Sequence, residues 1–162
     1  MNVVRPFLAS LLLSALVACG GGPDVEALQK DVESAVQAKD YAGAIAKADE
    51  ALKAEVVSKD AAKAWRFESL KLNAQADAGK GADVKAGLER LTAAYDKQLT
   101  AALYRSLADK LRAAGDAAGS VDILDAGSKK FPDDVSFKEA IEAAKQSADP
   151  AEIERLKALG YL

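Results

Sequence analysis

Hydrophobic residues recur every three or four positions along nearly the whole chain after residue 24, with short polar turns between the periodic segments. This spacing places them on one face of an α-helix. The pattern predicts eight helices, which begin after Asp24, after Asp40, at about Asp60, after Asp83, near Thr100, after Asp116, at Asp133-Asp134 and at Pro150. Because the turns are short, successive helices should pair as four antiparallel hairpins.

Turn residues indicate where several of these helices end. Gly79 and Gly115 suit the left-handed conformation that closes a helix, and Pro132 stops the sixth helix. Asp149 with Glu152 forms a variant of the capping box at the start of the last helix.

The helix predicted over residues 60–78 carries apolar residues on two sides. One stripe contains Trp65, Leu72 and Ala76, and the other contains Phe67, Leu70 and Ala74. A helix that is apolar on two sides is expected to lie between neighbouring helices.

Composition favours the same fold class. Alanine, the best helix former, occurs 36 times in 162 residues. The long segments also lack runs of β-branched residues, so we predict an all-α domain.

Near-constant hairpin spacing prompts a search for repeats. Residues 101–134 resemble a tetratricopeptide repeat through the following positions: Tyr104, Leu107-Ala108, Leu111, Gly115-Asp116, Ser120, Leu124, Gly127 and Pro132. Glycine in a helix interior costs about 1 kcal/mol relative to alanine, so Gly127 is expected to serve close packing.

The resemblance implies a short stack of repeats, over approximately residues 25–59, 60–97 and 101–134, with residues 135–162 as the C-terminal cap. Residues 25–59 match more loosely, and residues 60–97 match least. Ala44, Val84 and Ser120 occupy equivalent positions, 40 and then 36 residues apart. The alternative is a compact alanine-rich helical bundle without stacked repeats.

The N-terminus has the layout of a signal peptide: Arg5, an apolar run over residues 7–17, then small residues. Residues 16–19, Leu-Val-Ala-Cys, resemble the bacterial lipobox, which implies a diacylglycerol on Cys19, the only cysteine. The run is too short to span a membrane, which needs about 20 residues. The alternative is ordinary cleavage near Cys19 without a lipid, which would leave a free thiol.

These features divide the chain into a signal peptide (1–18), a lipidated tether (19–23) and a helical-repeat domain (24–162). Lipoprotein sorting in enteric bacteria uses Asp after the lipidated cysteine to retain proteins in the inner membrane. Gly20 occupies that position here, which implies the outer membrane, facing the periplasm.

The chain offers little catalytic chemistry. It has no histidine, a formal net charge of −3 and no glycine-rich phosphate loop. We therefore expect no enzyme activity, no cofactor or metal, and no nucleic-acid partner.

The resemblance to tetratricopeptide repeats suggests an interaction scaffold that binds another envelope protein or a peptide, with the membrane reached through Cys19. In that family the first helix of each repeat lines a concave groove. Polar residues that would face such a groove are Arg66, Asn73, Arg105, Asp109 and Arg112. The alternative is a structural or ligand-holding helical lipoprotein without a dedicated peptide groove.

Overall fold

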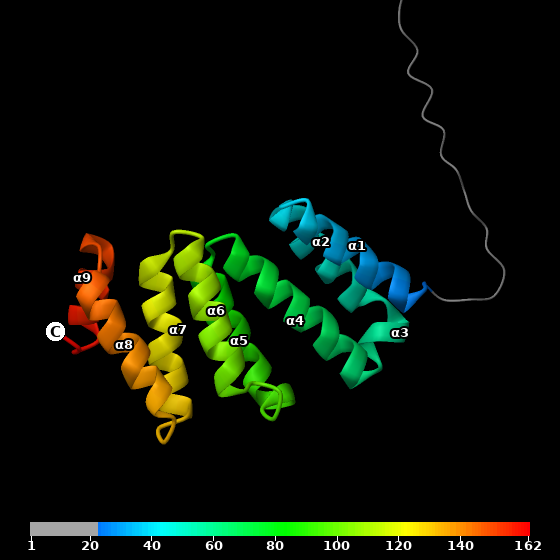
Figure 1. Cartoon of the computed structure of the whole chain (residues 1–162). Helices are drawn as coiled ribbons and strands as arrows, with labels where there is room; N and C mark the ends of the chain where they lie inside the picture. Colours follow the sequence, from blue (N-terminus) through cyan, green and yellow to red (C-terminus); the bar gives the residue numbers. More distant parts are fainter. Residues whose placement is uncertain (1–22) are drawn as a thin grey trace, which may run out of the picture.

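A computed structural model describes residues 23–162, which form nine α-helices and no strand within that range. The helices are α1 (Val25–Gln37), α2 (Tyr41–Lys53), α3 (Glu55–Ser58), α4 (Ala61–Asp77), α5 (Gly81–Tyr95), α6 (Ala101–Ala113), α7 (Ala117–Lys130), α8 (Val135–Ser147) and α9 (Pro150–Ala158). Helices α1, α2 and α3 lie at one end, α4 to α7 follow, and α8 and α9 lie at the other end (Figure 1). The predicted all-α fold is confirmed, and α3 is a single extra turn between the second and third predicted helices.

Side-chain caps start most of these helices. Aspartate accepts a backbone N–H at the start of α1, α2, α4, α7, α8 and α9, and Thr100 does so at α6. The predicted start after Asp83 was wrong: α5 begins at Gly81, and Asp83 lies in its first turn. The capping box at α9 is also only half formed. Asp149 accepts from the Glu152 N–H at 2.8 Å, but the Glu152 carboxylate bonds Arg112 instead of turning back.

Four helix ends share one turn geometry. Lys39, Gly79, Gly115 and Gly160 all have positive φ, between 58° and 89°. In each turn the next residue donates its N–H to the carbonyl five positions back, as Asp116 does to Leu111 at 2.9 Å. This is the Schellman motif. It confirms Gly79 and Gly115 as helix-ending residues, and it places Ala44, Val84 and Ser120 each five residues after the left-handed residue.

Lys39 is the one non-glycine among these four left-handed residues, at φ 58°. A side chain in that conformation costs about 1 kcal/mol. We expect Lys39→Gly to raise the free energy of unfolding by about 0.5 kcal/mol, since part of the gain is lost to the greater freedom of glycine in the unfolded chain. Gly115→Ala is the matched control and should cost about 1 kcal/mol, because a Cβ there meets nothing within 4 Å and only backbone strain changes. Urea denaturation measures both. A destabilised Lys39→Gly variant would contradict the expectation.

Asp116 caps two helices at once. Its Oδ1 accepts from the Gly119 N–H of its own helix α7 at 2.8 Å, and its Oδ2 accepts from the Gly81 N–H of α5, also at 2.8 Å. The N-cap residue of α5 is Lys80, whose side chain makes no cap hydrogen bond. The helix starts approach so closely that a Cβ on Gly81 would lie 2.7 Å from the Gly119 Cα. The third hairpin therefore supplies the cap that the second lacks.

We expect Asp116→Ala to cost about 2 kcal/mol, twice the roughly 1 kcal/mol of one lost cap. Asp40→Ala is the matched control, because Asp40 caps only its own helix, through the Gly43 N–H at 2.9 Å. Asp116→Asn keeps one acceptor and should fall between the two. Chemical denaturation of the three variants measures the difference. Equal losses for Asp116→Ala and Asp40→Ala would show that the bond to Gly81 contributes nothing.

Two hydrophobic clusters fill the interior, and α4 belongs to both. Phe67 and Ala74 of α4 are buried with α1, α2 and α3, and Leu70 packs against that cluster. Leu72 and Ala76 are buried with α5 to α9, and Trp65 packs against that second cluster. The two predicted stripes of this helix are confirmed as its two buried faces.

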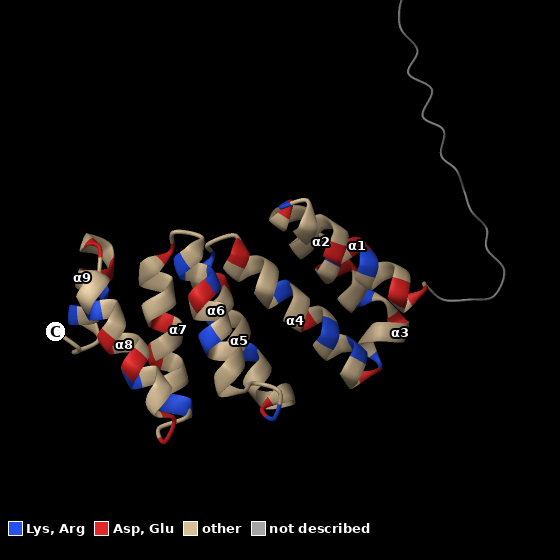
Figure 2. Ribbon diagram, in the orientation of Figure 1, with Lys and Arg blue, Asp and Glu red and all other residues tan. Residues whose placement is uncertain are grey.

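Several polar contacts join a residue of one hairpin to a residue of the next hairpin along the chain. Lys110 bonds Asp77 at 2.8 Å, 33 residues away, and Lys130 bonds Asp96, 34 residues away. Arg155 bonds Asp122, again 33 residues away. The same type of contact thus recurs between successive hairpins from α4 to α9. Basic and acidic residues are interspersed along the helices, as these pairings require (Figure 2).

Candidate functional site

Two of the five residues predicted to face a groove lie on α4. The guanidinium Nη1 of Arg66 donates to Oε1 of Gln29 on α1 at 2.8 Å. The Asn73 amide donates to the Ser69 carbonyl of its own helix at 2.8 Å. Both side chains therefore make contacts within the described chain.

Arg66 lies at the edge of a polar hollow of about 550 Å³ against α1. The Gln29 amide donates to Glu33 Oε1 at 2.5 Å, which extends the chain of contacts that starts at Arg66. The hollow is lined by Glu26, Gln29, Lys30, Glu33, Ser34, Gln37 and Arg66. Its amide and charged groups suit contact with a polar chain segment.

The other three predicted residues lie on α6. Arg112 donates to the carboxylate of Glu152 on α9, and Glu152 is only 1% exposed. The side chains of Arg105 and Asp109 make no hydrogen bond or ion pair with the rest of residues 23–162. Arg112 thus connects α6 to the C-terminal hairpin, while Arg105 and Asp109 retain their polar groups for solvent or a ligand.

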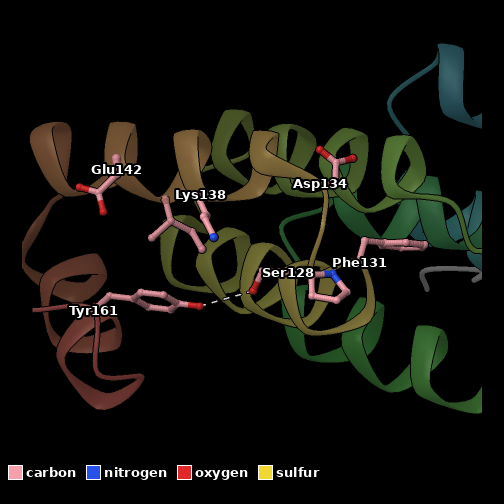
Figure 3. A pocket seen from close by; sticks show the side chains of 8 residues that line it. Ser128, Phe131, Asp134, Lys138, Glu142 and Tyr161 are labelled. Carbon is pink, nitrogen blue, oxygen red and sulfur yellow. Dashed lines mark hydrogen bonds between the residues drawn. The ribbon is translucent and has the colours of Figure 1, made fainter.

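A second, more apolar pocket of about 370 Å³ lies at the C-terminal end of the stack (Figure 3). The end of α7, the turn after it, α8 and the segment that follows α9 form its walls. Its lining residues are Ser128, Phe131, Pro132, Asp134, Lys138, Ile141, Glu142 and Tyr161. Aromatic packing shapes one wall, since the Phe131 ring stacks on Phe137 with centroids 6.3 Å apart and contacts Tyr104 edge-on at 5.9 Å.

Asp125 positions the two hydroxyl groups of this pocket. The Tyr161 hydroxyl donates to Asp125 Oδ1 at 3.1 Å, and the Ser128 hydroxyl donates to the Asp125 carbonyl at 2.9 Å. Asp125 is itself 7% exposed and accepts from Lys129 at 2.8 Å. Both hydroxyl oxygens keep lone pairs for a ligand donor.

Asp134 lies at the N-terminus of α8, where it accepts from the Ser136 N–H at 3.0 Å and from the Ser136 hydroxyl. The hydroxyl bond, then the N–H bond, and then the positive charge of Arg105 lower the pKa of Asp134. Arg105 therefore acts electrostatically on the C-terminal pocket, although it lies on α6.

Ser136→Ala removes the largest of these contributions, so we expect the pKa of Asp134 to rise toward its ordinary value of 3.8. A carboxylate with a lowered pKa stabilises the fold above its ordinary pKa, and this stabilisation disappears as the pH falls through the lowered value. The stability difference between wild type and Ser136→Ala should therefore be full at neutral pH and shrink at acid pH. Carbon-detected NMR titration of Asp134 gives the direct measurement. An unchanged pKa would contradict the expectation, and Ser147→Ala near the other end of α8 is the control.

Sequence patterns did not identify the C-terminal pocket. None of the patterns that predict the helices, their ends or the groove distinguishes Ser128, Lys138 or Tyr161 from other surface positions. Tyr161 and Asp125 are 36 residues apart, so their contact depends on how α9 returns to α7. The local sequence feature that could have indicated this pocket is Tyr161, a residue with a hydroxyl group directly after the helix-ending Gly160.

Cys19 and the lipobox lie outside the described residues. Among residues 23–162, no three His, Cys, Asp or Glu side chains are grouped as metal ligands would be. No helix in that range is long and apolar enough to cross a membrane.

Comparison of the chain with protein-family models, with curated proteins and with solved structures finds no match in any of the three, so the functional argument rests on the geometry described above.

Proposed function

We propose that this protein is a lipid-anchored interaction scaffold of the bacterial envelope, in which stacked helical hairpins bind a segment of another protein. The observation that carries the proposal is the recurrence of contacts between residues 33 or 34 positions apart, from α4 to α9. Stacks of this kind contact only neighbouring units and leave an extended surface free for partners.

Two hollows on that surface supply binding groups. The hollow between α1 and Arg66 offers amide and charged groups at one end of the stack. The C-terminal pocket offers apolar walls with hydroxyls and a lysine at the other end. A partner segment that contacts both ends would gain affinity, because the second contact forms at a high effective concentration.

The anchor would be Cys19, at the end of the lipobox-like sequence. Helix α1 begins at Val25, directly after its cap Asp24. Four residues separate Cys19 from Asp24, and the five Cα-to-Cα steps between them reach at most about 18 Å. The domain would therefore stay near the membrane surface, with α1 as its proximal end.

Site-specific photocrosslinking in living cells tests the scaffold. The crosslinker is placed at Gln37 in the hollow beside α1, at Glu142 in the C-terminal pocket, and at the exposed Glu50 on α2 as the control. We expect a discrete crosslinked protein from the first or second position and none from Glu50. No crosslink at any position, or the same bands at all three, would contradict a scaffold.

Cys19→Ser tests the anchor in the same cells. The variant should keep its helical circular dichroism spectrum, leave the membrane fraction and crosslink less, because the local concentration of an envelope partner falls. Continued membrane fractionation of Cys19→Ser would contradict the anchor and leave the crosslinking result to decide the scaffold.

A structural lipoprotein without a dedicated groove is the second candidate. It is favoured by the internal contacts of Arg66, Asn73 and Arg112, which occupy three of the five polar side chains predicted to face a groove. Such a protein would anchor through Cys19 and give no position-specific crosslink.

A further inference from the structure

The C-terminal pocket carries one uncompensated charge. Asp134, Lys138 and Glu142 are its charged lining residues. Ser136 is neutral, so its two hydrogen bonds leave the negative charge of Asp134 in place, and the positive charge of Arg105 on α6 offsets it. Glu142 pairs with Lys145 at 2.6 Å. Lys138 makes no ion pair with any other residue of 23–162, and it lines the pocket together with Ser128 (Figure 3). The free charge of this pocket is therefore positive.

The polar groups beside Lys138 are acceptors. The Ser128 hydroxyl donates to the Asp125 carbonyl and the Tyr161 hydroxyl donates to Asp125 Oδ1, and the two hydroxyl oxygens lie 3.5 Å apart (Figure 3). The remaining lone pairs of these oxygens can accept hydrogen bonds from a ligand. A backbone N–H is a suitable donor for such an oxygen. Lys138, by contrast, offers only donors, which suit a carboxylate.

The remaining walls are apolar. Phe131, Pro132 and Ile141 surround the space next to the Tyr161 ring. The volume of about 370 Å³ lies at the lower end of the range for ligand pockets, so it suits one apolar side chain with its adjoining backbone.

We infer that this pocket binds a peptide segment in which an apolar anchor residue lies next to an aspartate or glutamate. This inference rests on the proposed scaffold function and names the chemistry of its partner. The anchor side chain fills the apolar space, the neighbouring carboxylate pairs with Lys138, and a backbone N–H of the segment donates to the hydroxyl oxygens. Charge complementarity favours an acidic segment over a basic one.

NMR titration of the full chain tests the inference with blocked peptides. The probe is an acetylated and amidated Gly-Phe-Glu-Gly peptide, which carries no terminal charge. We expect shifts at Ser128, Ile141 and Tyr161, and at least a fivefold loss of affinity when Gln replaces Glu or Ala replaces Phe. Equal affinity of the Gln peptide would overturn the role of the carboxylate. Stronger binding of a Gly-Gly-Phe peptide with a free C-terminal carboxylate would overturn the assignment to an internal acidic segment.

A charge swap separates recognition from structural damage. Lys138→Glu should weaken binding of the Phe-Glu peptide at least tenfold and strengthen binding of the matching Phe-Lys peptide. Lys47→Glu, at an exposed lysine of α2, is the control with the same change of charge and should alter neither affinity. Unchanged binding by Lys138→Glu would overturn the inference.

The two proposals fail differently in cells. If the scaffold proposal fails, no position gives a specific crosslink. If only the pocket inference fails, either the Glu142 crosslink persists at full yield in the Lys138→Glu variant or Gln37 alone gives a crosslink. If both hold, Lys138→Glu removes the Glu142 crosslink, and Lys47→Glu does not.

Discussion

Replacing Arg112 by alanine is expected to lower the free energy of unfolding by about 2–3 kcal/mol, the cost of leaving a buried charged group without its hydrogen-bonded partner. The cost stays below that of a fully buried ion pair, because the Arg112 side chain is itself 37% exposed. Glu152 is 1% exposed, and the Arg112 guanidinium donates to its carboxylate from α6. In Arg112→Ala that carboxylate would be buried without its countercharge. Urea denaturation at neutral pH measures the loss.

Two further results would identify the cause. The double variant Arg112→Leu with Glu152→Met should be closer to wild type than Arg112→Ala, since no charge remains buried. Hydrogen exchange should show the lost protection mainly in α8 and α9. A loss below about 1 kcal/mol for Arg112→Ala, well under the usual cost, would mean that the pair is unimportant.

Arg112 is a poor site for testing partner binding, because its side chain also holds the C-terminal hairpin in place through Glu152. A charge reversal at Arg112 would damage the C-terminal hairpin directly, so its effect on partner binding would be ambiguous. Arg105 is the better probe of the α6 surface, because its side chain makes no hydrogen bond or ion pair within residues 23–162 and acts on Asp134 only through its charge.

Gly127→Ala should be the second large effect, with a loss of about 2–3 kcal/mol, typical of overpacking a filled core. A Cβ at Gly127 would lie 2.3 Å from Cε1 and 2.6 Å from Cζ of Phe137. Phe137 is fully buried and its ring stacks on Phe131, so it has no free side to move into. The gain of about 1 kcal/mol in helix propensity is smaller than this steric cost.

Gly87→Ala is the matched control within a helix. Its Cβ would lie 2.7 Å from Cδ2 of Leu72, the far end of a flexible side chain that can rotate away. The change should stay within about 0.5 kcal/mol of wild type, because the helix propensity gained offsets the adjustment. Adding Phe137→Leu to Gly127→Ala should recover part of the loss. Strict additivity of those two substitutions would contradict a steric conflict between them.

The close packing at Gly127 was predictable from the sequence, but the residue that it packs against was not. Its position in a helix predicted close packing, and the contact with Phe137 confirms this. The identity of the residue it contacts was outside the pattern, because Phe137 belongs to the next helix. The same holds for α4, whose two stripes were predicted but whose partner helices on each side were not.

The candidate site was predicted less well than the fold. Five polar residues were chosen because they lie on the first helices of hairpins, but helix position does not reveal side-chain partners. Three of them bond within the chain, to Gln29, Ser69 and Glu152. Lys138, which carries the pocket inference, lies on α8, outside the three predicted repeats.

The sequence by itself determined the helices, most of their ends and the all-α class. These features depend on hydrogen bonds within four or five residues, on aspartate caps and on glycines that adopt positive φ, all of which are local. The tertiary structure alone decided that Asp116 caps a second helix, that Arg112 neutralises Glu152, and that Lys138 lines the same pocket as the Ser128 and Tyr161 hydroxyls. Each of these contacts joins residues on different helices, and the first two span 35 and 40 positions. Interactions between residues close in sequence cannot bring these partners together. Their contact depends on how the hairpins stack.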